Sequence, residues 1–172
     1  MDLFLDSCVI ISYHIPCHPH YKKVLDFYNN NHINSQITCK KVEKEVRRKL
    51  NKILNEFKMS NDISDSDIRK IRHAINKFLR QIQPKDFSEL NRFLFEDLEL
   101  ELREVIKENP DDREILSNAV IWWSYQRPNT PVFLTLDYKD YKNIFGIKMT
   151  IYHCLSNNNI KVNPQNFNII IL

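Results

Sequence analysis

Apolar residues follow two patterns along the chain, short runs rich in β-branched and aromatic residues and longer stretches with helical spacing. The short runs predict buried strands at 3–5, around 36–37, and at 131–136, 148–152 and 168–172, with 9–11 as a further apolar segment beyond a polar turn at 6–7. The longer stretches predict helices at 20–30, 38–57, 68–82, 87–106 and from about 110 to 123. Because strands alternate with helices, we expect an α/β protein with a mostly parallel central sheet covered on both faces.

The predicted helices at 68–82 and 87–106 lie between the two groups of strands. A polar break at 61–67 precedes the first of them, and it ends before Pro84 because the residue before a proline disfavours helix. We therefore expect a helical hairpin at about 58–108, inserted between the two halves of a single domain that spans residues 1–172.

The length and composition are those of a globular domain. A chain of 172 residues can bury an apolar core, and 42% hydrophobic and 27% charged residues exclude fibrous and disordered classes. No apolar run approaches the ~20 residues that cross a bilayer, and the start lacks a signal-peptide pattern, so we expect a cytoplasmic protein without membrane contact. The cysteines have no paired spacing and are expected as free thiols, mostly buried. They are Cys8, Cys17, Cys39 and Cys154.

The formal net charge is only +3, but the charges are distributed unevenly. Residues 40–52 are strongly basic, and residues 96–112 are dominated by acids. A polyanion would be attracted to the first segment and repelled by the second. The alternative interpretation is that both segments are solvated helix faces.

Two aspartates directly follow predicted strands, Asp6 after 3–5 and Asp137 after 131–136. In open α/β sheets the carboxyl ends of the strands form the crevice where ligands bind. Glu45 and Asp112, near the starts of two predicted helices, can reach the same edge if the connections are right-handed. Crowded carboxylates repel one another unless a cation lies between them. Mg²⁺ or Mn²⁺ suits such a site, because these ions prefer oxygen ligands and can activate water for attack on a phosphodiester.

Four short motifs resemble those of PIN-domain nucleases. FLDSCVII at 4–11 resembles the opening strand and turn of that family, and VEKEV at 42–46 looks like its second motif. DREI at 112–115, followed by Ala119, is similar to the third, and FLTLDYKDY at 133–141 resembles the fourth, which is the most specific. The resemblance covers most of residues 1–152, whereas the hairpin at about 58–108 is longer than in the compact members.

The resemblance implies a three-layer α/β/α sandwich and a metal-dependent endoribonuclease that acts on single-stranded RNA, leaving 5′-phosphate and 3′-hydroxyl ends. It assigns binding of Mg²⁺ or Mn²⁺, and catalysis, to Asp6, Glu45, Asp112 and Asp137, with Ser7 as a supporting hydroxyl. Basic residues next to Glu45 are expected to hold the RNA phosphates. They are Lys40, Arg47 and Arg48.

Rival assignments exist for two of the acids. Glu43 replaces Glu45 if the second motif shifts by two residues, and Asp111 replaces Asp112 if the following helix is rotated. Asp140 is a further candidate for contact with a metal-bound water. Asp112 and Asp111 could also simply offset a helix dipole, and Glu45 could be one surface acid among many. Asp6 is the hardest acid to explain in this way, because a charge between two apolar segments is seldom left without a partner.

Two further clusters permit other functions. His14, Cys17, His18 and His20 could suggest a zinc site, but their spacing and the neighbouring prolines favour an exposed loop. Trp122 and Trp123 could stack on bases, although adjacent helix positions do not share a face, so one of the two is expected in the core.

Other functional classes stay open from the sequence. The chain could be a catalytically silent RNA-binding or assembly module of the same fold, or a structure-specific DNA nuclease. As the toxin of a toxin–antitoxin pair it would also bind an antitoxin protein. Besides RNA, the chain could also bind a second copy of itself and form a homodimer.

Overall fold

A parallel sheet lies at the centre of the molecule. The computed structural model describes residues 1–172 apart from the side chain of Pro164. Its strands are β1 (Asp2–Leu5), β2 (Ser35–Ile37), β3 (Pro131–Thr135) and β4 (Asn168–Ile171). They are ordered β2-β1-β3-β4, and every neighbouring pair is parallel. The predicted α/β class with a parallel sheet is confirmed.

Helices connect the strands. In chain order they are α1 (Ser7–His14), α2 (Tyr21–Asn30), α3 (Lys40–Met59), α4 (Asp65–Ile82), α5 (Arg92–Glu101), α6 (Pro110–Gln126), α7 (Tyr138–Tyr141) and α8 (Ile144–Asn157). The predicted helix at 87–106 is divided into α5 and two 3₁₀ turns, Ser88–Leu90 and Leu102–Glu104. None of the helices in the described residues combines the length and the apolar character needed to cross a membrane.

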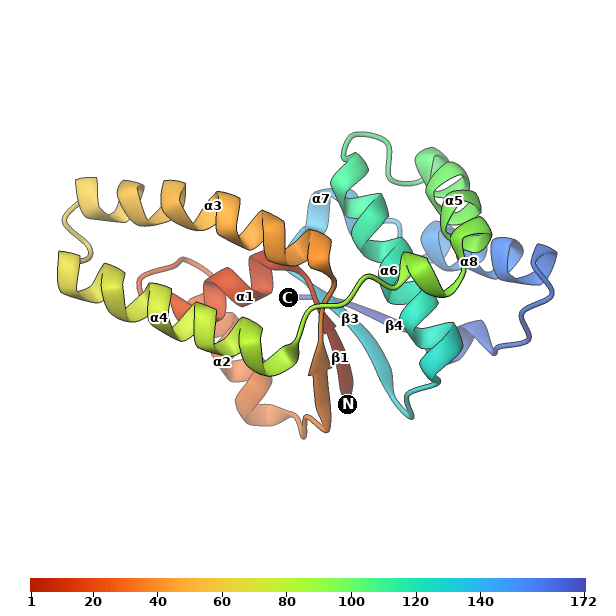
Figure 1. The fold of residues 1–172 in the computed structure, drawn as a ribbon, viewed down its shortest axis with the longest axis horizontal. Helices are drawn as coiled ribbons and strands as arrows, with labels where there is room; N and C mark the ends of the chain where they lie inside the picture. Colours follow the sequence, from red (N-terminus) through yellow and green to blue (C-terminus); the bar gives the residue numbers. More distant parts are fainter.

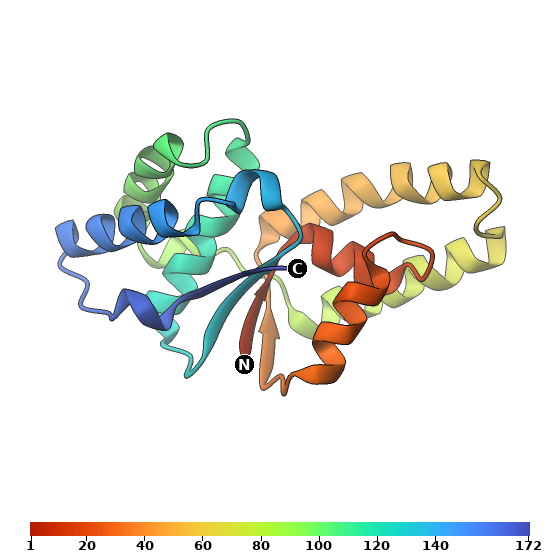
Figure 2. The same ribbon diagram turned by 180° about the vertical axis from the view of Figure 1, so that it is seen from behind.

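Helices cover both faces of the sheet. Helix α6 lies in front of the strands in Figure 1, whereas α1 and α2 lie in front of them in Figure 2. Phe4 of β1 packs toward α6, with its ring centroid 5.7 Å from that of Trp122. Its neighbours Leu3 and Leu5 point to the opposite face, because successive side chains of a strand alternate, and all three are fully buried. This arrangement is compatible with a three-layer α/β/α fold.

Two segments predicted as extended are helical. Residues 9–11 lie in α1, which begins directly after Asp6 because the Asp6 side chain accepts a hydrogen bond from the Ser7 N–H, the interaction of an N-cap. Helix α1 buries almost every side, so its sequence lacks amphipathic spacing. Residues 148–152 lie in α8, where Ile147, Ile151 and Leu155 are buried at helical spacing.

Two helices, α3 and α4, project from the molecule as a hairpin, and this hairpin covers residues different from those of the expected one. Helices α3 and α4 run side by side away from the sheet and are joined by a short turn (Figure 1). The expected hairpin at 58–108 thus shares only α4 with this projection, because α5 packs instead against α6 and α8. The helix predicted from residue 38 begins two residues later, with Cys39 at the N-cap position, and the Thr38 hydroxyl donates instead to the Leu5 carbonyl at 2.7 Å.

The strand order creates a switch point between β1 and β3. From β1 the chain first moves to β2 on one side and later returns to place β3 on the other side of β1. In open parallel sheets, the crevice outside the carboxyl ends of two such strands is the usual ligand site. Asp6 follows β1 and Asp137 closely follows β3, so both acids lie at this crevice.

Candidate metal and active site

Asp6 lies at the end of β1, with 3% of its surface exposed. Its carboxylate accepts hydrogen bonds from the Ser7 N–H at 2.5 Å, the Thr135 hydroxyl at 2.7 Å and the Cys8 thiol at 3.2 Å. Burial raises the pKa of Asp6, and the nearby charge of Glu45 acts in the same direction. The backbone N–H of Ser7 therefore supports Asp6, whereas the sequence had suggested its hydroxyl.

Thr135, the last residue of β3, connects the two strand ends. Its hydroxyl donates to Asp6 and accepts a hydrogen bond from the Asp137 N–H at 3.0 Å. Thr135 is fully buried, so this connection is shielded from water. Asp137 in turn caps α7 by accepting a hydrogen bond from the Asp140 N–H at 3.1 Å. One hydroxyl thus fixes the relative positions of two predicted site residues.

Asp112 reaches the same place from the first turn of α6. That helix begins at Pro110, where the absence of an N–H costs nothing, and Asn109 caps it by accepting from the Asp111 N–H at 3.1 Å. The Asn109 side chain also donates to the Asp112 carboxylate at 2.6 Å. Asp112 is 4% exposed, so its carboxylate lies inside the crevice.

Asp112, Asp137 and Asp140 form a group that could hold a metal ion. One carboxylate oxygen from each lies within 4.8 Å of the others. Burial, hydrogen bonding with Asp140 and the charges of Asp6 and Asp137 together raise the pKa of Asp112 to about 9. This crowding is what a bound cation would relieve. Asp140, a secondary candidate from the sequence, thus joins the acids, and Asp6 lies beside this group.

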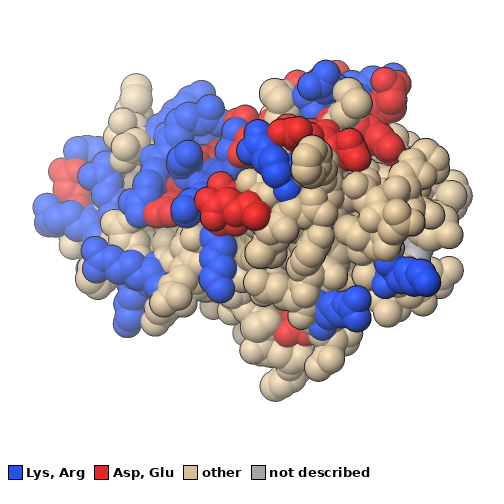
Figure 3. All heavy atoms as spheres, turned by 45° about the vertical axis from the view of Figure 1, so that its right-hand side comes forward, with Lys and Arg blue, Asp and Glu red and all other residues tan. Residues whose placement is uncertain are grey.

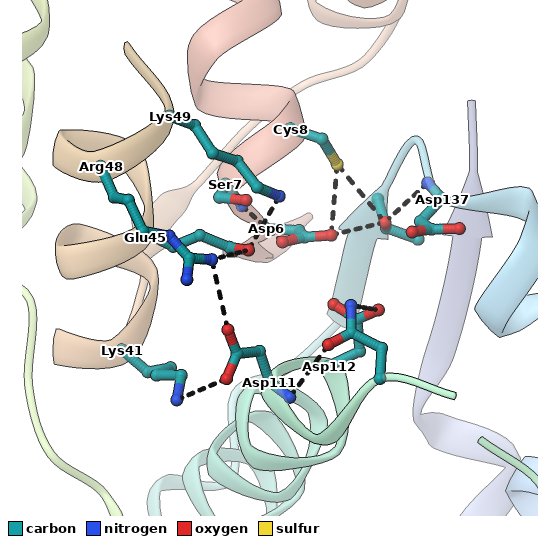
Figure 4. Close-up of polar contacts among 12 residues, drawn as sticks. Asp6, Ser7, Cys8, Lys41, Glu45, Arg48, Lys49, Asp111, Asp112 and Asp137 are labelled. Atoms are coloured by element: carbon teal, nitrogen blue, oxygen red, sulfur yellow. Dashed lines mark hydrogen bonds and ion pairs between the residues drawn. The ribbon is translucent and has the colours of Figure 1, made fainter. Parts of the chain in front are cut away.

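Glu45 approaches from α3 on the other side of Asp6 (Figure 4). It is 4% exposed, and one carboxylate oxygen forms ion pairs with Lys49 Nζ at 2.8 Å and Arg48 Nη2 at 3.6 Å. Its other oxygen, Oε2, is buried and has no hydrogen-bond partner in the described part of the chain. A buried carboxylate oxygen without a partner is costly, so this atom is available for a ligand.

The rival acids have different neighbours. Glu43 accepts hydrogen bonds from Arg47 on the exposed side of α3. Asp111 pairs with Lys41 at 2.8 Å and with Arg48, and the hydrogen bond from Lys41 lowers its pKa. Glu45 and Asp112 are therefore the members of each pair that face the buried acids, as Figure 4 illustrates for Glu45, Asp111 and Asp112.

The three predicted phosphate-binding residues lie in different surroundings. Arg48 borders the acids, because it pairs with both Glu45 and Asp111. Lys40 is exposed at the start of α3, and Arg47 points toward α4, where it donates to Asn76 at 3.2 Å. A hollow of about 190 Å³ opens beside the acids. It is lined by Lys41, Lys44, Glu45, Arg48 and Asp111.

The other candidate clusters have structural roles. The histidine ring nitrogens bond locally, His14 Nδ1 to the Ile10 carbonyl at 2.8 Å and His18 Nδ1 to the Ser12 hydroxyl at 3.0 Å. Trp122 and Trp123 are 3% and 4% exposed, so neither can stack on a base in this structure. All cysteines are free, as expected; Cys39 and Cys154 are buried, whereas Cys8 and Cys17 are only partly buried.

Four residues at the site were missed by the sequence analysis: Cys8, which donates to Asp6, and Thr135, Asn109 and Lys49. Thr135 lies within the fourth motif, two residues before Asp137, and this position at a strand end was a usable signal. Asn109 was recognised only as a helix boundary, although a capping side chain has a second polar group free to hold a neighbour. Lys49 is four residues after Glu45, the spacing at which helix side chains meet.

Comparisons with protein-family models, with curated proteins and with solved structures found no significant match to this chain.

Proposed function

We propose that this protein is a Mg²⁺- or Mn²⁺-dependent endoribonuclease that hydrolyses single-stranded RNA and leaves 5′-phosphate and 3′-hydroxyl ends. The observation that carries the proposal is the meeting of buried and partly buried carboxylates at the switch point of a parallel sheet. Asp112, Asp137 and Asp140 approach within 4.8 Å, Asp6 lies next to Asp112, and Glu45 lies next to Asp6. Such a concentration of like charge, with Asp6, Glu45 and Asp112 buried, is unfavourable for the fold alone.

The donor set fits a hard divalent cation. The group consists of carboxylates, and the unpartnered Oε2 of Glu45 adds an oxygen without a competing hydrogen bond. Asp112, Asp137 and Asp140, with Asp6 and Glu45 directly or through water, would hold the ion. When bound, the ion would supply an activated water and neutralise charge developing on the phosphate.

The remaining side chains favour a polyanionic substrate. Arg48 and Lys44 line the hollow beside the acids, and phosphate groups are natural partners for such charges. Lys49 adds a third positive charge next to Glu45. Burial alone would lower the pKa of Lys49, but its hydrogen bond to Glu45 and the negative charges of Glu45 and Asp6 together raise it, so the ammonium stays charged. These residues would hold the phosphate backbone against the metal site.

The resemblance to PIN-domain nucleases supports the same proposal, because all four motifs supply residues to this crevice. Asp6 comes from the first, Glu45 from the second, Asp112 from the third, and Thr135, Asp137 and Asp140 from the fourth. We extend the proposal to a PIN-like fold on this basis. The competing classes, a silent RNA-binding module and a DNA nuclease, differ from it in metal-dependent turnover and in substrate preference.

A cleavage assay tests the proposal. Labelled single-stranded RNA and DNA of one sequence are incubated with the protein plus Mg²⁺, Mn²⁺ or EDTA, and the ends of the products are identified. We expect metal-dependent cleavage of the RNA, and loss of cleavage in Asp6→Asn, because asparagine keeps the N-cap of α1 but removes the charge. Asp26→Asn, an exposed acid of α2, is the control that should retain activity. A folded Asp6→Asn protein with the parental rate would refute the proposal.

A further inference from the structure

The α3–α4 projection is the most basic part of the molecule. Helix α3 contains eight Lys and Arg residues against three Glu, and α4 contains five against two Asp. The net charge of the whole chain is only +3, so the rest of the molecule is acidic overall. Figure 3 shows Lys and Arg side chains gathered over the left part of the molecule, with Asp and Glu prominent at the upper right.

Hydrogen bonds between the two helices join their basic residues into one surface. Arg47 of α3 donates to Asn76 of α4 at 3.2 Å, and Arg72 of α4 donates to Asn51 of α3 at 3.1 Å. Four residues of α4 therefore lie on the face beside Arg47, because they recur at helical spacing. They are Arg69, Arg72, Asn76 and Arg80, all exposed.

Several of these charges have no acidic partner. In the described residues, Lys44, Arg69, Lys77 and Arg80 form no ion pair within 4.0 Å. Lys77 and Arg80 instead border a hollow of about 490 Å³ on α4, together with His73, Asn76 and Gln81. Uncompensated like charges held this close repel one another, and a polyanion lying across them would remove that repulsion.

The surface is also connected to the acid crevice. Arg48 contacts Glu45 at the crevice, and Lys44 lines the hollow beside it, one helical turn before Arg48. From there the exposed side of α3 continues through Arg47 to α4. A helix of 20 residues, such as α3, spans about 30 Å, far more than the length of one nucleotide. We name this surface the basic track, defined by Lys44, Arg47, Arg48, Arg69, Arg72, Lys77 and Arg80.

We propose that the basic track binds the phosphates of RNA that flanks the cleaved bond, so that the enzyme prefers long RNA strands over short ones. This inference rests on the proposed ribonuclease function and adds the substrate requirement. Helix α5 carries four acids against one arginine and repels phosphate, so the flanking strand leaves the crevice over α3 and α4. Contacts to phosphates carry no base preference, and the requirement is therefore for length, not sequence.

The test compares two triple variants with the same change in charge. Arg69→Gln/Lys77→Gln/Arg80→Gln removes three charges of the basic track, and all three side chains are exposed, so the fold should be retained. Lys22→Gln/Lys23→Gln/Lys161→Gln removes three exposed charges elsewhere and is the matched control. Binding is measured in EDTA over a series of salt concentrations, and cleavage is measured separately with Mn²⁺.

We expect the track variant to bind a long single-stranded RNA of about 20 nucleotides more weakly, with a salt slope lower by about 2, because each single-strand phosphate contact adds about 0.7 to that slope. Its KM for this RNA should rise about tenfold or more with little change in kcat. Cleavage of a short RNA of about four nucleotides, near the smallest single-strand sites, should be unaffected. The control variant should behave like the parent.

Equal losses in the two variants would overturn the inference, because they would indicate a general charge effect. Unchanged RNA binding by the track variant would also overturn it, and binding of an acidic polypeptide to the track instead would identify a protein as its partner. If the parent binds RNA through the track but cleaves none with any metal, the proposed catalytic function fails while the binding surface stands. If the track variant cleaves the long RNA with the parental KM, the basic track does not bind the substrate, and the proposed ribonuclease function is unaffected.

Discussion

The Thr135 hydroxyl joins Asp6 to the backbone of Asp137 and also contacts the Cys8 thiol. Thr135→Val keeps the shape of the side chain but removes these hydrogen bonds in a fully buried position. We expect a loss of about 1–3 kcal/mol in the free energy of unfolding, the usual result of leaving buried polar groups unpaired. Metal affinity and cleavage should fall roughly 10–100-fold, as for other residues that orient metal ligands.

Urea unfolding in EDTA and titration with Mn²⁺ measure the two effects separately. Thr150→Val in α8, outside the site, serves as the control. A Thr135→Val protein with parental affinity for Mn²⁺ would mean that Asp6 and Asp137 do not depend on this connection.

Asp112 gives the metal-free protein a specific dependence on pH. Its pKa is raised from the ordinary 3.8 to about 9 by burial, by Asp140 and by the neighbouring acids. The folded state thus keeps a proton that the unfolded chain releases, and the free energy of unfolding should decrease as the pH rises between about 4 and 9. Asp112→Asn cannot release this proton, so its stability in EDTA should exceed that of the parent near pH 8.

Chemical unfolding of both proteins in EDTA at several pH values tests whether Asp112→Asn is more stable than the parent at high pH. The advantage of Asp112→Asn should shrink as the pH falls toward 3.8 and below, because the parent carboxyl then becomes protonated in the unfolded chain as well. A variant that is less stable than the parent at every pH would show that the charged carboxylate supports the fold.

At the scale of elements, the start of α6 performs two tasks through one side chain. Asn109 caps the helix and also donates to the Asp112 carboxylate. Asn109→Ser keeps a good capping group but cannot reproduce the amide donor, whereas Asn109→Ala loses both. We expect Asn109→Ala to lose about 1 kcal/mol of stability, and Asn109→Ser to lose much less. Both variants should bind Mn²⁺ more weakly.

Thermal unfolding and Mn²⁺ titration of this pair separate capping from positioning. The assignment of Asn109 as a positioning residue requires that Asn109→Ser is stable but deficient in metal binding. Parental metal affinity in this variant would leave Asn109 with the capping role alone.

The elements that the sequence predicted correctly are those whose patterns are set by local contacts. The predicted strands at 3–5 and 131–136 are apolar apart from Thr135, because both faces of the sheet are covered. Helices α3 and α4 have clear stripes of buried residues facing the core. Helix α1 was missed because it is buried on nearly all sides, so that Val9, Ile10 and Ile11 are as apolar as a strand.

The candidate site, like the fold, was predicted correctly where local sequence patterns determine the position of a residue. Acids that directly end a strand or begin a helix, such as Asp6 and Asp112, have a position that the local pattern fixes. Asn109 and Lys49 support acids three and four residues away, and the spacing alone was a usable signal for both. The support that Thr135 gives to Asp6 joins residues far apart in the sequence, so the pattern of a single segment does not contain it. The different roles of Arg47 and Arg48 likewise follow from the packing of α4 beside α3.

At the scale of the whole molecule, the proposed metal site would couple metal binding to stability. Residues from β1, α3, α6 and the segment after β3 meet there, so the complete site exists only in the folded chain. A ligand that binds only the folded state adds about 2.7 kcal/mol to the free energy of unfolding at a concentration 100-fold above its Kd. Mn²⁺ should therefore raise the melting temperature of the parent, and should not raise that of an Asp112→Asn/Asp137→Asn double variant.

Differential scanning calorimetry in Mn²⁺ and in EDTA provides this comparison, with Ca²⁺-free buffer and equal ionic strength in both. An equal rise in the double variant would indicate that Mn²⁺ binds elsewhere on the protein.

The central claim is that the carboxylates at the switch point of the sheet hold a divalent ion. A crystal structure of the protein grown with Mn²⁺, with anomalous scattering used to locate the metal, tests it most directly. We expect an anomalous peak among Asp112, Asp137 and Asp140, with Asp6 and Glu45 coordinating directly or through water, at oxygen distances of about 2.0–2.2 Å. A well-ordered crystal at saturating Mn²⁺ with no peak in this crevice would contradict the account.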